Sequence, residues 1–162
     1  MPRRLIRKAA GFFRQPLWAR CWLFPVWALL GLAKAVILIV PFHRIAPHLG
    51  RRMGVAPWVP LLGPAQEARA LQIGRVVRLA ARYTPWDSNC FPQAVAARVL
   101  LGLHGIPYVL NLGLMREPGT GDLKAHAWVS AGRICVTGGA AFGEFTTVGG
   151  FVAPALADAG QA

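Results

Sequence analysis

Near Gly105 the spacing of the apolar residues changes from helical to alternating. Before this point, over residues 68–83 and 90–104, apolar residues recur every three or four positions, which places them on one face of a helix. After it, over residues 108–114, Tyr or Leu stands at every second position, which is the pattern of a strand with one buried face. Helices followed by strands in this way predict an α+β fold.

The second predicted helix, residues 90–104, has a defined start and end. Ser88 or Asn89 is a suitable N-cap residue, because a short polar side chain can accept a hydrogen bond from a free backbone N–H of the first turn. Gly105 is a typical C-terminal stop. Cys90 is therefore expected at the N-terminus of a helix.

Two more strands are predicted after the turn-rich segment EPGTGD. They cover residues 124–130 and 133–137, and Ala131-Gly132 is expected to join them as a two-residue hairpin turn. The glycine-rich region after Gly138 has no pattern that favours a helix or a strand. The sheet is thus expected to be antiparallel, with its last part undefined.

Residues 1–66 and 67–162 differ in charge. The first region contains ten Lys or Arg and no Asp or Glu, whereas the second contains eight basic and six acidic residues. Such a basic region favours anionic lipid, nucleic acid or an acidic peptide as a partner. We expect no nucleic-acid partner, because the chain has neither a basic-aromatic strand pattern nor a zinc-finger spacing.

Residues 21–42 are apolar and long enough to cross a bilayer, although they contain Lys34. Both flanks are basic, so the positive-inside rule gives no orientation. We expect a helix packed on the rest of the protein, with contact to a membrane surface as the alternative. The Pro- and Gly-rich residues 53–67 are expected to form a linker, which divides the chain into an N-terminal helical region, 1–66, and a second domain, 67–162.

The three cysteines, Cys21, Cys90 and Cys135, have neither a CxxC pair nor the Cys/His spacing of a metal site. They are therefore expected to be reduced thiols of a cytoplasmic protein, with no bound metal. A secretory signal fits poorly, because the apolar stretch is longer than a usual signal core and lacks a clear cleavage site. No motif for a cofactor is evident, and the pattern does not decide whether a nucleotide affects activity.

Among the thiols Cys90 is the candidate nucleophile. The positive end of a helix dipole and the free N–H groups of the first turn favour the thiolate, which is the reactive form of cysteine. Cys21 lies in the apolar stretch, and Cys135 lies in the middle of a predicted strand, where a small buried residue is expected.

His126 is the candidate base. It shares a face of its predicted strand with Trp128, and a structural histidine is the alternative interpretation. The other histidines lie in the basic N-terminal region or at a helix end, where a cation is favourable: His43, His48 and His104. A helix that begins with Cys and packs on an antiparallel sheet that carries His can bring thiol and imidazole within hydrogen-bond reach.

Three stretches of the chain carry a family resemblance: PFHRIAPHLG, YTPWDSNCFPQAVAARVLLGLHGIPYVLNLG and AHAWVSAGRICVTGG. They resemble the split form of lasso-peptide biosynthesis B proteins, which carries the C-terminal cysteine-protease part. The resemblance implies a papain-type, transglutaminase-like core with Cys90 and His126 as the catalytic pair. The implied reaction is removal of the leader peptide from a lasso-peptide precursor, a ribosomally made peptide, before the macrolactam forms.

The chain departs from this family at the acid that usually follows the histidine on the next strand. With a turn at Ala131-Gly132, antiparallel counting places Thr137 opposite His126, and no carboxylate is there. Thr137, a backbone carbonyl, or an acid from elsewhere such as Glu144 or Asp122 would then have to orient the imidazole.

Three residues near the catalytic pair are candidates for substrate or oxyanion contact. The Cys90 backbone N–H, together with a donor from Asn89 or Trp86, would form an oxyanion hole. Trp86 and Trp128 are equally compatible with a packing role.

The resemblance also implies partners. A split member lacks a leader-recognition domain, so we expect the precursor peptide, a separate leader-recognition protein and an ATP-dependent macrolactam cyclase. Two alternatives remain: another acyl-transfer enzyme of the same fold, which would use the same Cys and His, and a small basic membrane-associated protein.

Overall fold

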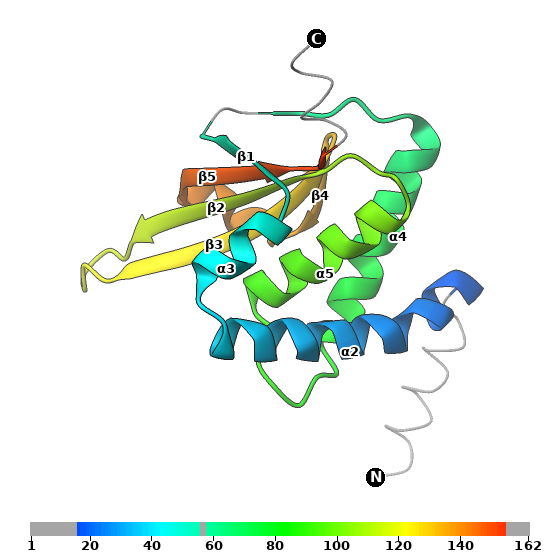
Figure 1. Ribbon diagram of the computed structural model, residues 1–162, viewed down its shortest axis with the longest axis horizontal. Coiled ribbons are helices and arrows are strands. Elements are labelled where there is room, and N and C mark those ends of the chain that lie inside the picture. Colours follow the sequence, from blue (N-terminus) through cyan, green and yellow to red (C-terminus); the bar gives the residue numbers. More distant parts are fainter. Residues whose placement is uncertain (1–15, 56–57, 155–162) are drawn as a thin grey trace.

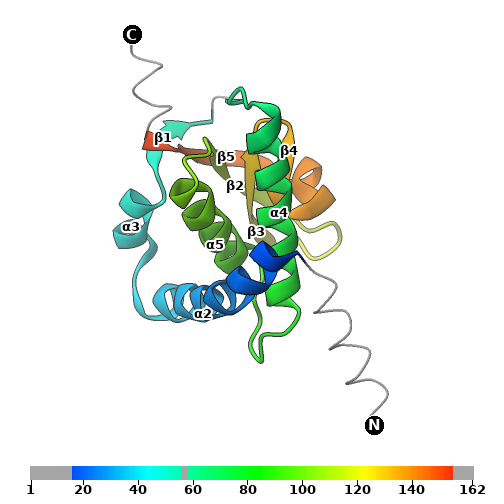
Figure 2. The ribbon, with the colours of Figure 1, turned by 90° about the vertical axis from the view of Figure 1, so that its right-hand side faces the viewer.

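The computed structural model describes residues 16–55 and 58–154. In chain order its elements are α2 (Leu17–Ile39), α3 (Phe42–Ile45), η1 (Ala46–His48), β1 (Arg51–Gly54), α4 (Pro64–Ala81), α5 (Cys90–Leu103), β2 (Val109–Arg116), β3 (Leu123–Ala131), β4 (Ile134–Thr137), η2 (Gly139–Glu144) and β5 (Thr146–Val152), where η marks a 3₁₀ helix. The strands form one antiparallel sheet in the order β1-β5-β2-β3-β4, and α4 and α5 pack on one of its faces (Figures 1 and 2). The predicted α+β fold is confirmed.

The α4 helix starts earlier than the predicted residue 68. Gly63 is its N-cap residue and Pro64 occupies the first helical position, where the missing N–H of proline leaves no hydrogen bond unmade. The Gly63 N–H donates to the Gln66 side chain at 3.1 Å, which closes the first turn. The last part of the expected linker is therefore helical.

The α5 helix begins at Cys90, as predicted. Asn89 is the N-cap residue with an extended backbone, and its side chain makes no capping hydrogen bond. The apolar face of α5 lies in the core, where Leu100 and Leu101 are fully buried. Burial of this size contributes about 1.5–3 kcal/mol for each such side chain.

The β3–β4 hairpin has a different turn from the predicted one. Ala131 pairs with Ile134, so the two turn residues are Gly132 and Arg133, one position later than expected. Gly132 has φ +57°, a left-handed conformation that glycine adopts without strain. A bulge follows in β4, because Ser130 pairs with Cys135 but Val129 pairs with Thr137. The predicted pairing of His126 with Thr137 is wrong, since β4 ends opposite Val129.

The glycine-rich region without a predicted structure forms η2 and β5. β5 lies between β1 and β2, so the end of the described chain completes the middle of the sheet. β1, at residues 51–54, comes from a segment in which no strand was predicted and pairs with β5. Both predicted regions, residues 1–66 and 67–162, thus contribute described residues to one sheet and one core.

The α2 helix lies across α4 and α5 at one edge of the molecule (Figure 1). Its inner face contributes Val26 and Leu30, which are fully buried. Among the described residues, α2 alone is long and apolar enough to cross a membrane, with a mean hydropathy of 2.0. A core helix and a signal sequence meet the same length and hydropathy criteria, so this property by itself assigns no location.

Candidate active site

Cys90 is the first residue of α5, and its half-buried side chain packs against the hydrophobic core. No side chain caps the helix, so backbone N–H groups of the first turn remain available to an anion at this end. The loop before it is held by the Gln93 side chain, which donates to the Ser88 carbonyl at 2.7 Å. Cys90 therefore lies at the end of α5 where free backbone N–H groups point, with an ordered loop before it.

His126 lies on β3, and its ring orientation is fixed by the main chain. Its Nε2 lies 2.9 Å from the carbonyl oxygen of Gly138. A carbonyl can only accept a hydrogen bond, so Nε2 carries the proton and Nδ1 of the neutral ring keeps a free lone pair. The ring also stacks on Phe145 and Trp128, with centroid distances of 4.8 Å and 5.9 Å. His126 is thus held in the tautomer that a base requires.

Two glycines make room for this aromatic cluster. A Cβ at Gly113, which pairs with His126 across β2 and β3, would lie 2.8 Å from atoms of both Phe145 and Trp128. Gly138 has φ +100°, and a Cβ there would overlap Trp128. Trp128 itself is 7% exposed. The two glycines therefore allow Trp128 and Phe145 to pack against the His126 ring and hold it in place.

The structure brings α5 against β3, but it does not join the two reactive groups directly. Ala127 and Val129 face the helices and belong to the core, so His126 and Trp128 lie on the alternate face, where η2 is found (Figure 2). At His126, β3 forms the edge of the sheet, since β4 pairs only from Val129 onward. In the part of the chain that the structure describes, no hydrogen bond joins the Cys90 thiol to the imidazole.

The side chains predicted to orient the imidazole do not contact it. Thr137 is buried opposite Val129, and its hydroxyl has no hydrogen-bond partner among the described residues. Asp122 lies in the β2–β3 turn, where its backbone carbonyl accepts a hydrogen bond from Glu117. Glu144 is exposed at the end of η2. Of the groups predicted to orient the imidazole, the backbone carbonyl is the one that contacts it, and it belongs to Gly138.

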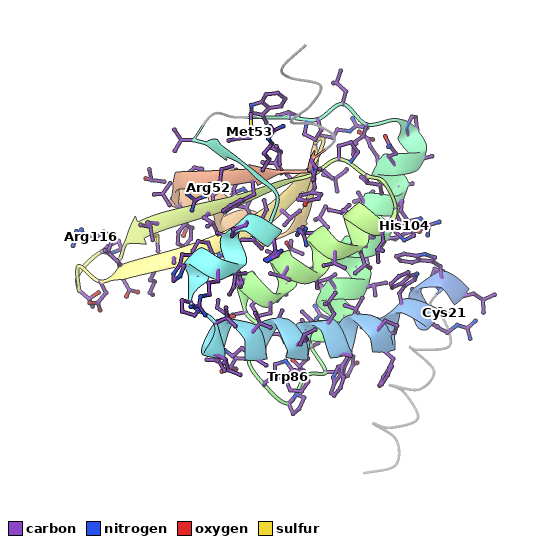
Figure 3. The ribbon with its side chains drawn as sticks, in the orientation of Figure 1. Cys21, Arg52, Met53, Trp86, His104 and Arg116 are labelled. Atoms are coloured by element: carbon purple, nitrogen blue, oxygen red, sulfur yellow. The ribbon has the colours of Figure 1, made fainter. Side chains whose placement is uncertain are left out.

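Trp86 lies away from the sheet. Its ring is 4.8 Å from that of Trp27, and a Cβ at Gly31 would lie 2.8 Å from it, so Trp86 packs closely on α2. Figure 3 shows Trp86 beside α2 at the outer edge of the molecule. Asn89, by contrast, is exposed next to Cys90. Of the two predicted side-chain donors, only Asn89 adjoins the nucleophile.

The other two thiols have different surroundings. Cys135 is exposed on β4, and the prediction that it is buried is wrong. Its Sγ donates to the Thr137 carbonyl at 3.3 Å. Partial burial of the thiol raises its pKa, because the charged form is less well solvated there. Cys21 is exposed on α2. The protonated state is therefore favoured at Cys135, which makes it a poorer nucleophile than a cysteine at a helix N-terminus.

A cavity of about 350 Å³ is lined by residues of α3, β1, β2 and β5. Its wall residue Phe42 has a ring 6.1 Å from that of Phe91, which lies in the first turn of α5. Arg52 is its charged wall residue, and the remaining wall is apolar or backbone: Gly54, Leu112, Val148, Gly149, Gly150 and Phe151. An extended peptide could lie here with one anionic group near Arg52.

A family model of the transglutaminase-like superfamily matches residues 36–149, which is more than two thirds of the chain. The chain belongs to the transglutaminase-like superfamily. This fold is typically that of a cysteine-dependent enzyme, and both Cys90 and His126 lie inside the matched segment. Searches of curated proteins and of solved structures found no match to the chain.

For this transglutaminase-like protein, sequence reasoning missed Gly138 and Phe145 as neighbours of His126. The pair Gly138-Gly139 does signal an unusual backbone, but no local pattern shows which side chain its carbonyl meets.

Among the described residues, no three His, Cys, Asp or Glu side chains are grouped so as to hold a metal ion.

Proposed function

We propose that this protein is a cytoplasmic cysteine protease that removes the leader peptide from a lasso-peptide precursor. Cys90 is the nucleophile and His126 the general base. The observation that carries the proposal is the hydrogen bond from His126 Nε2 to the Gly138 carbonyl, because it leaves Nδ1 unprotonated for the thiol. The superfamily supports cysteine-dependent acyl chemistry, and the sequence resemblance supports the choice of substrate.

The reaction begins when Nδ1 of His126 removes the proton from the Cys90 thiol. The thiolate attacks the carbonyl carbon at the leader–core junction, and the imidazolium returns the proton to the amine of the core peptide as the C–N bond breaks. The leader is left as a thioester on Cys90. Water then gives a proton to His126 and attacks the thioester, which releases the leader carboxylate and restores the thiol.

This mechanism requires the two groups to move closer than they are here. The side chains must approach to about 3 Å, a contact that often tightens only when substrate binds. The oxyanion would be held by the Cys90 N–H and the Asn89 side chain, which makes no competing cap hydrogen bond.

The chain would work with the precursor, a separate leader-recognition protein and an ATP-dependent cyclase. Leader recognition by a separate partner is what the resemblance to the split form of the family supports. The cavity next to Phe42 would receive residues near the cleaved bond.

The test is mass spectrometry of a precursor incubated with this protein and its recognition partner. Cleavage at the leader–core junction by wild type and by Cys135→Ala, but not by Cys90→Ala, is the expected result. Equal cleavage by Cys90→Ala would disprove the proposed nucleophile. An added amine distinguishes the alternative of another acyl-transfer enzyme, because transfer gives a leader amide in place of a leader acid.

A further inference from the structure

The α2 helix is apolar on both of its faces, although only one is covered. Its inner face packs on α4 and α5. Large apolar side chains on its outer side are 61% to 80% exposed: Leu17, Phe24, Leu32, Leu38 and Ile39. A helix that is apolar all round is normally buried, so the outer face requires a second covering surface.

From Cys21 to Ile39 no charged residue lies on this outer face, whereas Arg20, just before it, falls on the same side as Phe24. At the helical spacing of 100° per residue, Cys21, Ala28 and Ala35 fall on the same side as the exposed Phe24, and each of them is exposed as well. Figure 3 shows Cys21 on α2 at the outer edge of the molecule. The outer face is thus a continuous apolar strip along α2.

Positive charge flanks the strip. Lys34 lies at the side of α2, Arg20 lies at the N-terminal end of the strip, and both are half-buried. The sequence up to residue 66 contains ten basic and no acidic residues. Basic residues beside an apolar helix face favour an anionic bilayer surface, because the two attractions act together. A neutral apolar protein surface would use the strip but not this charge.

Arg20 also lines a cavity of about 300 Å³ between α2 and the end of α4, together with Phe24, Trp27 and Tyr83. The Nε of Arg20 is buried and has no hydrogen-bond partner among the described residues. A guanidinium group whose Nε has no partner, beside an apolar cavity, is suited to a lipid phosphate whose chain occupies the cavity.

The packing of α2 excludes a simple transmembrane span for this fold. Val26 and Leu30 are fully buried against the rest of the core, and Trp27 donates a hydrogen bond to the Tyr83 carbonyl at 3.2 Å. A span would remove these side chains from the core, and each buried aliphatic side chain contributes about 1.5–3 kcal/mol. The helix can remain packed and still meet a bilayer with its outer face.

We propose that α2 binds in the plane of an anionic membrane surface, with its outer apolar strip in the lipid interface and Arg20 at a phosphate headgroup. This binding depends on α2 and its flanking charge, and it does not require that the protein is a protease.

The first experiment is co-sedimentation of the full chain with vesicles. Wild type should bind vesicles of equal parts phosphatidylglycerol and phosphatidylcholine, and should bind vesicles of phosphatidylcholine alone much more weakly. The double variant Phe24→Glu, Leu38→Glu should lower binding about tenfold or more, because both changes put charge into the apolar strip. Leu61→Glu is the matched control, since Leu61 is 96% exposed outside α2 and should bind like wild type.

The Arg20 contact has its own variant. Arg20→Gln should weaken binding to the anionic vesicles and leave binding to neutral ones unchanged. Wild type that binds neither vesicle, or a double variant that binds as wild type does, would overturn the proposal. A stable dimer that Phe24→Glu dissociates, with no vesicle binding, would assign the strip to a second copy of the chain instead.

Depth measurements separate a surface helix from a span. With Cys90 and Cys135 replaced by Ala, a label on Cys21 reports one end of α2, and a label on Ala28→Cys in a Cys21→Ala background reports its middle. A helix in the plane of the membrane puts both labels at the same shallow depth. A middle label near the bilayer centre would show a span and contradict the proposal. Circular dichroism confirms that each variant keeps its fold.

Discussion

The imidazole Nε2 of His126 lies 2.9 Å from the carbonyl oxygen of Gly138, the residue that follows β4. This carbonyl occupies the place at the imidazole that the acid of a Cys-His-acid triad would otherwise take. A carbonyl fixes the tautomer as a carboxylate does, but it carries no full charge to stabilise the imidazolium. Orientation of the base therefore depends on backbone geometry at one glycine.

Replacement of Gly138 by Ala should lower cleavage by about a hundredfold, the cost expected when a catalytic group is displaced by about 1 Å. The residue has φ +100°, and the new Cβ would overlap Trp128, so the loop and its carbonyl must move. Gly139→Ala is the matched control, because Gly139 also has positive φ but open space at its Cβ. Similar kinetics for the two variants would contradict the orienting role of the Gly138 carbonyl. Thermal unfolding should show a cost of about 1–3 kcal/mol for positive φ in both.

Thr137→Val should leave activity unchanged and raise stability by about 1 kcal/mol. The buried Thr137 hydroxyl has no partner, so its removal relieves an unsatisfied polar group without loss of a hydrogen bond. Precursor cleavage and urea unfolding measure the two effects. If the variant instead lost activity while it remained folded, the hydroxyl would act in the site after all.

His104 should make the protein less stable in mild acid. Its ring lies 5.7 Å from Trp18 and 5.9 Å from Trp22, and burial, followed by the charge of Arg69, lowers the pKa of His104 below its usual 6.5. The predicted cation at this helix end is thus disfavoured. Because the unfolded chain binds a proton that the folded chain resists, folding stability should fall as the pH drops below 6.5 toward the lower folded pKa.

The measurement is the thermal midpoint between about pH 7 and pH 5. His104→Gln should flatten its pH dependence in this window, whereas His43→Gln, at an exposed position, should not. An unchanged slope in His104→Gln would assign the acid sensitivity to other groups.

Gly31→Ala should not give the usual gain of an alanine in a helix. Ala is favoured over Gly by about 0.5–1 kcal/mol, but its Cβ would lie 2.8 Å from the ring of Trp86. Gly102→Ala on α5, where nothing lies within 4 Å of the new Cβ, should show the gain. Chemical unfolding compares the two. A gain at Gly31 equal to that at Gly102 would mean that Trp86 is loosely held.

A second variant tests the same contact. Trp86→Ala should cost about 2–3 kcal/mol as a half-buried aromatic residue, and in its background Gly31→Ala should recover the helix gain. If Trp86→Ala lowered cleavage with no loss of stability, Trp86 would contact substrate and not α2.

The local sequence determined α4 and α5, the first strands of the sheet and the place of Cys90. These features follow from interactions between residues close in the chain. Helical spacing and Gly105 define α5, although the predicted cap hydrogen bond of Asn89 is not made, and alternation defines β2 and β3 within one or two residues. Such signals are readable because they need no knowledge of distant partners.

Only the tertiary structure decided which groups surround His126. The β3–β4 register, the insertion of β5 beside β2, and the approach of Gly138 and Phe145 to the imidazole all depend on residues brought together from separate elements. The place of Trp86 on α2 is of the same kind. Hydrophobic period and capping specify how each segment folds. They do not determine which backbone carbonyl or ring the segment contacts, because that depends on packing of the whole core.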